Sequence, residues 1–156
     1  MSVNQEYRPN VAAVIVSEKY PRTCEIFVAE RSDIEGAWQF PQGGIDEGES
    51  VKEALFRELK EEIGTNKVKI IAEYPEWITY DFPENVKETM KPFKGQKQRY
   101  FLVRLEDKSK INLNTEHPEF KEHDFVGLDK LFSVVTHFKR PVYKEVVKYF
   151  QKEGYL

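Results

Sequence analysis

The sequence predicts an α/β (α+β) fold in which helices cover both sides of a mixed central sheet. Short apolar runs bounded by turn residues indicate strands, and two longer segments with helical periodicity lie between and after them. The chain has 156 residues, of which 40% are hydrophobic and 13% aromatic, enough for one ordinary domain with a real core. Because no repeat, low-complexity tract or linker interrupts it, we expect a single domain over residues 1–156.

The strand predictions begin with Val11–Val16, a continuous and largely β-branched apolar run. Glu25–Ala29 follows it across a Tyr20-Pro21 turn signal. Trp38–Phe40 is predicted as a short strand that stops before Pro41, since proline cannot donate to a β-ladder. The remaining predicted strands are Val68–Ala72, Glu76–Tyr80, Arg99–Leu105 and Asp124–Leu128.

Two helices are predicted, the first over Ser50–Ile63 and the last over Pro141–Lys152. Ser50 and Glu53 have the spacing of a capping box, and Gly64 stands where a C-terminal cap glycine belongs. The last helix begins with proline in its first turn, and an apolar face recurs at Val142, Tyr143, Val146, Val147 and Phe150.

Charge and composition exclude several classes of partner. A formal net charge of −3 argues against an extended, sequence-blind nucleic-acid surface, so we expect no DNA partner, although a local basic pocket for one phosphate chain remains compatible. Cys24 is the only cysteine, so no internal disulfide can form and a reducing compartment fits. No apolar run approaches the ~18 residues of a membrane span, so we expect a cytoplasmic protein with no membrane partner.

The first helix carries carboxylates where a core-facing helix normally carries apolar residues. At about 100° per residue, one side gathers Val51, Ala54, Leu55 and Leu59. Glu58 and Glu62 point into the same stripe, and Glu61 lies at its edge. Burying unpaired carboxylates together is costly, because desolvation and mutual repulsion both oppose their charges.

These acids allow two interpretations. They could form a solvated face, paired with Lys60 or Arg57 at helical spacing. Alternatively, a cluster of hard oxygen ligands beside a glycine-rich loop would suit Mg²⁺ or Mn²⁺. Such an ion would relieve the repulsion, bridge phosphate oxygens and lower the pKa of a bound water. The overlap with the apolar stripe favours the metal.

The segment from Gly43 to Thr65, GGIDEGESVKEALFRELKEEIGT, resembles the Nudix box, the signature of the Nudix hydrolase family. Only Thr65 departs from the pattern, in place of an aliphatic residue whose role is packing behind the helix. The positions in register are Gly43, Glu49, Arg57, Glu58, Leu59, Glu61, Glu62 and Gly64.

The resemblance implies a Nudix-like α/β/α sandwich and hydrolysis of a nucleoside diphosphate linked to another group. Glu58, Glu61 and Glu62 would then bind the metals, with Glu58 also a possible base for the attacking water. The backbone carbonyl of Gly43 would complete the coordination. Arg57, which would orient the glutamates through ion pairs, and Glu49 would have structural roles.

Segments outside the box resemble the bacterial RNA pyrophosphohydrolase branch of the family, which overlaps the dinucleoside polyphosphate hydrolases, and most closely the enzymes of Helicobacter and its relatives. Unlike in some relatives, we expect no RNA contact from a basic tail after the last helix. The segments that carry this resemblance are Tyr7–Val11, Trp38–Gly44, Gly95–Gln98, Pro118–Phe120 and Phe138–Arg140.

The branch resemblance also implies a catalytic or metal-binding role for Glu119 on a loop, where an ordinary exposed acid is the alternative. It implies substrate contacts for Arg8, Arg31, Tyr80, Lys97, Phe138 and Lys139. The lysines and Arg8 would contact phosphates, since anionic chains need such donors, unless they are merely solvated. Arg31 and Phe138 could sandwich a base, whereas composition alone would place Phe138 in the core.

The leading hypothesis is therefore metal-dependent conversion of a 5′-triphosphorylated RNA end to a monophosphate. The alternative within the same chemistry is hydrolysis of diadenosine polyphosphates such as diadenosine tetraphosphate. A different class, a catalytically silent nucleotide- or RNA-binding module, is disfavoured because Glu58, Glu61 and Glu62 are all intact.

Overall fold

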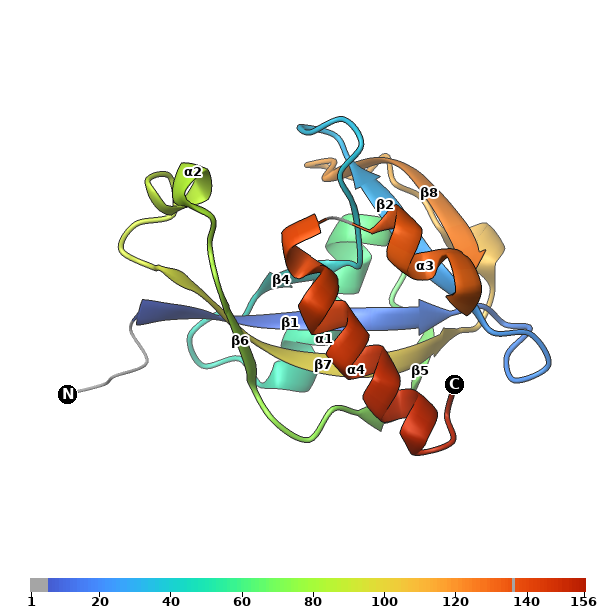
Figure 1. Ribbon diagram of the computed structural model, residues 1–156. Helices are drawn as coiled ribbons and strands as arrows, with labels where there is room; N and C mark the ends of the chain where they lie inside the picture. Colours follow the sequence, from blue (N-terminus) through green and yellow to red (C-terminus); the bar gives the residue numbers. More distant parts are fainter. Residues whose placement is uncertain (1–5, 136) are drawn as a thin grey trace.

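The computed structural model describes residues 6–135 and 137–156, which contain one eight-stranded sheet flanked by helices (Figure 1). The strand order is β3-β2-β1-β7-β5, while β4 pairs with β1, β6 with β7 and β8 with β2. The strands are β1 Tyr7–Val16, β2 Glu25–Arg31, β3 Trp38–Gln39, β4 Gln42–Gly44, β5 Val68–Glu73, β6 Ile78–Asp81, β7 Gly95–Leu105 and β8 Phe120–Gly127. The α-helices are α1 Val51–Ile63, α2 Glu84–Lys87, α3 Leu128–Val134 and α4 Arg140–Lys152, with short 3₁₀ turns at Lys108–Lys110 and His137–Lys139.

The centre of the sheet is a parallel pair, β1 and β7, in register from Tyr7 opposite Gly95 to Val16 opposite Arg104. Every other strand pair is antiparallel, so the mixed sheet predicted from the sequence is confirmed. Val11–Val16 is buried on both faces, which explains why this strand is a continuous apolar run without alternation.

Two apolar cores lie on opposite faces of the sheet. Figure 1 shows α4 crossing in front of the sheet and α1 behind it. Val14 and Val16 face the core under α3 and α4, whereas Ala13 and Ile15 face the core under α1. The predicted α/β/α sandwich is therefore confirmed.

Several boundaries differ from the predictions. The strand predicted at Asp124–Leu128 is β8, Phe120–Gly127, and Leu128 instead begins α3, which the sequence did not predict. Four consecutive residues of β8 are exposed, so the strand lacks the alternation that would have revealed its start. Phe40 lies outside β3 and packs on Tyr143, with ring centroids 4.1 Å apart.

The strand predicted at Glu76–Tyr80 is β6, Ile78–Asp81, and the two short elements β4 and α2 were not predicted. Among the described residues no helix is both long and apolar enough to cross a membrane.

Candidate active site

Helix α1 is fixed at both ends by the caps that its sequence predicted. The Ser50 hydroxyl accepts a hydrogen bond from the Glu53 N–H at 3.1 Å, and the Glu53 carboxylate accepts one from the Ser50 N–H at 2.8 Å. Gly64 ends the helix with φ of 79°, a left-handed conformation that glycine adopts without strain. Between the caps, Ala54, Leu55, Leu59 and Ile63 are buried against the sheet. The two caps and this packing hold α1 with the same side facing the sheet.

Burial of the acids on α1 follows the helical projection. Glu62 is only 4% exposed, and its carboxylate accepts a hydrogen bond from the Gln42 N–H at 3.1 Å. Desolvation raises the pKa of Glu62 well above its usual value, and repulsion from Glu58 and Glu119 adds to the shift. Desolvation also raises the pKa of Glu58, although the Arg57 guanidinium opposes it. Glu61 lies at the edge, with a side chain 58% exposed.

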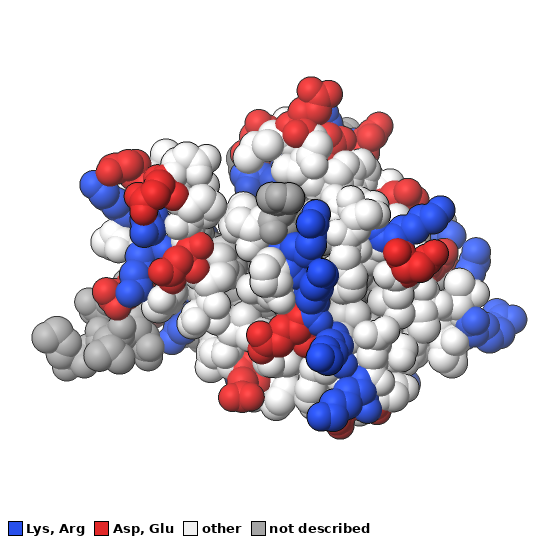
Figure 2. All heavy atoms as spheres, viewed as in Figure 1, with Lys and Arg blue, Asp and Glu red and all other residues white. Residues whose placement is uncertain are grey.

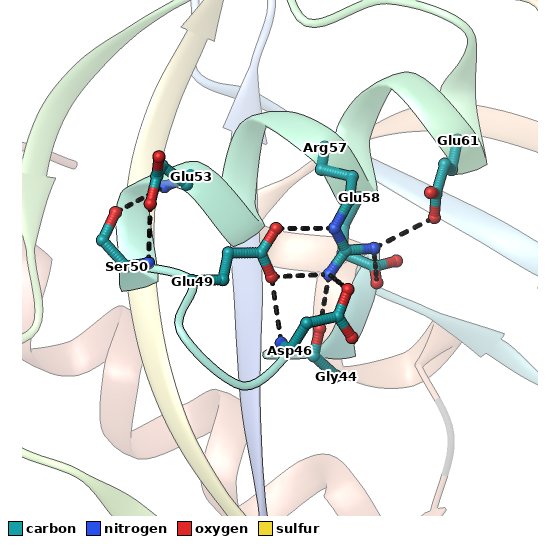
Figure 3. A network of polar contacts seen from close by, with 8 residues as sticks. All are labelled: Gly44, Asp46, Glu49, Ser50, Glu53, Arg57, Glu58 and Glu61. Atoms are coloured by element: carbon teal, nitrogen blue, oxygen red, sulfur yellow. Dashed lines mark hydrogen bonds and ion pairs between the residues drawn. The ribbon is translucent and has the colours of Figure 1, made fainter.

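Arg57 ties four carboxylates and the glycine-rich loop together (Figure 3), with the Asp46 carboxylate the most distant at 3.6 Å. Its guanidinium donates to Glu49 at 2.7 and 2.9 Å, to Glu58 at 2.8 Å and to Glu61 at 3.2 Å. It also donates to the carbonyl of Gly44 at 2.8 Å. These hydrogen bonds from Arg57, together with one from the Asp46 N–H, lower the pKa of Glu49 to about 2. The geometry places Arg57 as an organiser of the acids, away from the cleft.

Gly43 and Gly44 let two charged side chains lie directly against the backbone of β4. A Cβ added at Gly43 would lie 1.9–2.3 Å from the Glu58 carboxylate, and one at Gly44 would lie 2.3 Å from the Arg8 guanidinium. Pairing of β4 with β1 fixes this stretch, with Gly43 opposite Val11. The loop before α1 therefore brings the Glu58 carboxylate and the Arg8 guanidinium to neighbouring positions.

Glu119 reaches the acids of α1 from the segment just before β8. Glu119 borders both cavities that Glu58 and Glu62 border, and its negative charge contributes to the raised pKa values of these two acids. Ser32 fixes this segment, because its N–H and hydroxyl both donate to the Glu119 carbonyl, at 2.9 and 3.1 Å. The role of Ser32 in holding this segment could not be inferred from the sequence, since 87 positions separate Ser32 from Glu119.

A cleft of about 610 Å³ joins these acids to a second group of side chains. The cleft is lined by the acids Glu58, Glu61, Glu62 and Glu119 and also by the sequence-predicted substrate residues Arg8, Arg31, Tyr80, Phe138 and Lys139. A smaller hollow of about 360 Å³ lies against the same acids and is bordered by Lys60, Thr115 and His117. The acids thus stand where two cavities meet.

The structure does not bring Lys97 into the cleft. Its position on β7 alternates with Gln96 and Gln98, whose side chains face the cleft side of the sheet. The Lys97 ammonium lies instead 5.0 Å from the centre of the Trp77 ring. Lys97 therefore does not reach a phosphate in this cleft.

Lys139 is buried at the floor of the cleft, only 4% exposed, and donates to the side-chain carbonyls of Gln39 at 3.2 Å and Gln42 at 3.1 Å. Desolvation, with a smaller contribution from the nearby charge of Arg31, lowers the pKa of Lys139 to about 7. Gln42 also donates its backbone N–H to Glu62, so one residue links the buried lysine to the buried acid.

A row of buried amides, which the sequence reasoning missed, continues from Lys139. Because an ammonium only donates, the Gln42 oxygen must face Lys139, and Gln98 then donates to Gln42 at 3.0 Å and to Asn10 at 2.8 Å. The amide nitrogen of Asn10 is left buried without a hydrogen-bond partner, and Asn10 lines the cleft. This row could have been predicted from the sequence, because its polar residues stand at inward-facing positions of otherwise apolar strands.

The outer end of the cleft combines a guanidinium with aromatic rings. Arg31 donates to both carboxylate oxygens of Asp33, at 2.8 and 2.7 Å, which fixes the plane of its guanidinium. Phe138 is 39% exposed and therefore not a core residue, and its ring centre lies 6.0 Å from that of Tyr80. The Tyr80 hydroxyl donates to Gln96 at 2.9 Å, and desolvation raises its pKa to about 12.

The residues present fit a divalent cation by the chemistry of their donors. Four carboxylates and a nearby backbone carbonyl are hard oxygen ligands, and the cost of burying Glu58 and Glu62 together is what a cation would remove. Within the described part of the chain, no three acidic, histidine or cysteine side chains already converge as a metal cluster. Glu58 and Glu61 are engaged by Arg57 instead.

The NUDIX domain family matches residues 6–150, and the chain belongs to this family. It is therefore a hydrolase of phosphoric anhydride bonds, as its sequence predicted, and enzymes of this family generally work with divalent metal ions. The chain is 57% identical to an RNA pyrophosphohydrolase of Campylobacter jejuni over the whole of both chains. It is 60% identical to the Nitratiruptor protein of that name over 97% of each chain, and 59% identical to the Helicobacter pylori one over 99% of each.

Solved structures with little sequence identity share the fold. An Ap4A hydrolase of C. elegans matches with a TM-score of 0.70 and 19% identity, over 94% of this chain and 98% of that one. The dihydroneopterin triphosphate pyrophosphohydrolase of E. coli matches with a TM-score of 0.67 and 15% identity, over 87% and 92% of the two chains.

Proposed function

We propose that the protein is an RNA pyrophosphohydrolase that converts 5′-triphosphorylated RNA to 5′-monophosphorylated RNA with Mg²⁺ or Mn²⁺. The main support is that one cleft contains the acids of α1, the cations proposed to bind phosphate and an exposed aromatic ring. Support also comes from the full-length relatives named RNA pyrophosphohydrolase. Such a substrate belongs to the cytoplasm, where we propose that the enzyme acts.

Metal binding is assigned to Glu58, Glu61, Glu62 and Glu119, together with the carbonyl of Gly43. A bound divalent ion would polarise phosphate oxygens and make a water molecule a better nucleophile. Glu62 and Glu58 supply charge from a desolvated position, where electrostatic attraction to a cation is strong. Arg57 and Glu49 have a structural role, because their hydrogen bonds set the orientation of Glu58.

Glu58 is the proposed general base that takes the proton of the attacking water. Burial raises its pKa, which makes it a better proton acceptor than an exposed glutamate. Lys139 and Arg8 bind phosphate oxygens, since both are donors only and both line the cleft. Burial lowers the pKa of Lys139 to about 7, and an anionic phosphate beside it would raise that pKa again and favour the ammonium form.

Arg31 and Phe138 are proposed to hold a base of the RNA between a guanidinium and an aromatic face. Asp33 keeps the guanidinium plane fixed through its two hydrogen bonds, so less freedom is lost when a base stacks on it. Tyr80, whose ring neighbours Phe138, completes this side of the cleft.

A substrate comparison tests the proposal. The purified protein is incubated with 5′-triphosphate RNA and with diadenosine tetraphosphate, each with Mg²⁺ and with Mn²⁺, and kcat/KM is compared. We expect a higher value on RNA, and loss of turnover on both substrates in Glu58→Gln but not in Glu47→Gln, an exposed acid of the preceding loop. Unchanged RNA beside an active control enzyme, or a clear preference for the dinucleotide, would overturn the assignment.

A further inference from the structure

Four basic residues of α4, Arg140, Lys144, Lys148 and Lys152, follow one another at intervals of four positions. Figure 2 shows them as a continuous stripe over α4, which we call the basic ridge. Lys144, Lys148 and Lys152 are exposed, and Arg140 is half-buried. A formal net charge of −3 for the whole chain conceals this local concentration of positive charge.

The fold itself does not require the basic ridge. Packing of α4 is provided by its opposite side, where Tyr143, Val146, Val147 and Phe150 are buried. Like charges four positions apart repel each other on a helix, and α4 has no acid in its first turn to complement the positive end of the helix dipole. A sequence selected for helix stability alone would alternate these charges with acids.

Acidic neighbours do not neutralise the basic ridge. Among the described side chains, no carboxylate lies within ion-pair distance of Lys144, Lys148 or Lys152. Glu145, the acid within this stretch of the helix, is engaged by the Tyr74 hydroxyl at 2.7 Å. The Lys144 ammonium lies 5.8 Å from the centre of the Phe132 ring, a contact that leaves its positive charge in place, so all three charges remain available to an anion.

The basic ridge begins directly after the cleft residues in the chain, with Arg140 itself half-buried and donating to the Val135 carbonyl at 3.4 Å. Phe138 and Lys139, which line the cleft, immediately precede Arg140 at the start of α4. From there to Lys152 the helix rises by ~18 Å, at about 1.5 Å per residue over 12 residues. A strand that leaves the cleft past Phe138 therefore meets a line of cations leading away from the acids.

We propose that the basic ridge binds the phosphates of the single-stranded RNA downstream of the nucleotides held in the cleft. The inference rests on the proposed function and adds a second contact region to it. Lysine ammonium groups are point charges that contact phosphates without reading bases, so the region is insensitive to sequence and sensitive to RNA length. A dinucleotide or a dinucleoside polyphosphate would be too short to reach Lys148 and Lys152.

The test replaces Lys144, Lys148 and Lys152 together with glutamine and measures binding of a 12-nucleotide single-stranded RNA bearing a 5′-monophosphate. Fluorescence anisotropy of a 3′ label gives Kd over a range of salt concentrations. Each lost phosphate contact lowers the slope of log Kd against log salt by ~0.7, so we expect a decrease of about 2 and roughly tenfold weaker binding at low salt. The matched control is Lys19, Lys52 and Lys110 to glutamine, which removes the same charge from other exposed positions.

Turnover adds a second readout. On a 12-nucleotide 5′-triphosphate RNA, the ridge variant should show a raised KM with kcat unchanged, while kcat/KM on a triphosphorylated dinucleotide equals that of the wild type. An equal loss on both lengths, or an equal loss of salt slope in the control variant, would overturn the proposal.

The binding measurement also separates this inference from the proposed function. If the wild type binds RNA through the basic ridge but leaves 5′-triphosphate RNA uncleaved, the ridge stands and the proposed function fails. If RNA is cleaved but the ridge variant binds and turns over both lengths like wild type, only the ridge proposal fails. Loss of binding to vesicles of anionic lipid, with RNA binding intact, would assign the ridge to a membrane surface and overturn the RNA assignment.

Discussion

Gly43 and Gly44 are neighbours in β4, yet each makes room for a different charged group. A methyl group at Gly43 would meet the Glu58 carboxylate, and one at Gly44 would meet the Arg8 guanidinium. Both are the far ends of flexible side chains, which can move aside without unfolding the protein. Neither glycine has a positive φ, so alanine brings no backbone strain at either position. These two substitutions therefore separate the roles of the acid and the cation.

We expect Gly43→Ala to lower kcat by about tenfold or more, because Glu58 is displaced from the reacting water. Gly44→Ala should raise KM several-fold with kcat nearly unchanged, because only the phosphate contact of Arg8 is displaced. Steady-state kinetics on the RNA substrate measures both, and thermal unfolding verifies that each variant is folded. Identical kinetic defects in the two variants would contradict the separate assignments.

Phe138 is an exposed aromatic residue that also lines the cleft, and its place in the cleft is the reason to expect a ligand on its face. Phe138→Ala should raise KM by about fivefold to a hundredfold, since base stacking on an aromatic ring contributes about 1–3 kcal/mol, while kcat changes little. Trp77→Ala is the matched control, because Trp77 is equally exposed but does not line the cleft. An unchanged KM in Phe138→Ala would remove the ring from substrate binding.

At the scale of the element, α1 is the part of the molecule that the sequence predicted most completely. Its N-terminal cap, its C-terminal glycine and its inward side all follow from local rules: a hydroxyl that accepts an N–H, a residue free to adopt positive φ, and a period of 3.6. The burial of Glu62 and the partial burial of Glu58 could be predicted for the same reason.

Contacts between distant segments could not be predicted in this way. The parallel pairing of β1 with β7 and the approach of Glu119 to α1 depend on how the chain returns, not on spacing along it. Lys97 shows the limit most clearly. Motif resemblance placed it with the phosphate-binding residues, but alternation along β7 turns its side chain toward Trp77.

Removal of the cap on α1 gives a test at this scale. Ser50→Ala should lower the free energy of unfolding by about 1 kcal/mol, since the N–H of Glu53 loses its acceptor. Urea denaturation should show a lower midpoint with an unchanged m-value, and kcat/KM well below the melting temperature should stay near wild type. Lys52→Ala, at an exposed position of the same helix, is the control. A loss of activity without a loss of stability would mean that the cap positions the acids and does little for the helix.

At the scale of the whole molecule, the site lies where the two layers of the sandwich meet the end of the sheet. Helix α1 belongs to one apolar core and carries the acids, whereas α4 belongs to the other and follows Phe138 and Lys139 in the chain. Between them, the amides of β4 and β7 connect Lys139 to Glu62 through Gln42. The proposed substrate contacts therefore come from the sheet and from the segment before α4, whereas the proposed metal ligands come mainly from α1.

The buried acids of α1 should therefore lower the free energy of unfolding until a cation binds. Glu62→Gln keeps the acceptor for the Gln42 N–H but removes a carboxylate whose charge burial disfavours. In a chelator such as EDTA, this variant should therefore melt at a higher temperature than wild type. Saturating Mg²⁺ at about 100 times its Kd should stabilise the wild type by ~2.7 kcal/mol, or about 5–11 °C in Tm for a chain of this size, and the variant by less.

Differential scanning calorimetry with and without Mg²⁺ measures both shifts, and Glu47→Gln should behave like wild type in each condition. If Glu62→Gln melts below the wild type in the chelator, the carboxylate is a structural acceptor for Gln42, and the metal is not what justifies its burial. If instead the variant gains stability in the chelator but responds to Mg²⁺ as fully as wild type, the cation is held without Glu62. Glu62 is assigned to the cation only if Glu62→Gln melts at a higher temperature than the wild type in the chelator and is also stabilised less by Mg²⁺.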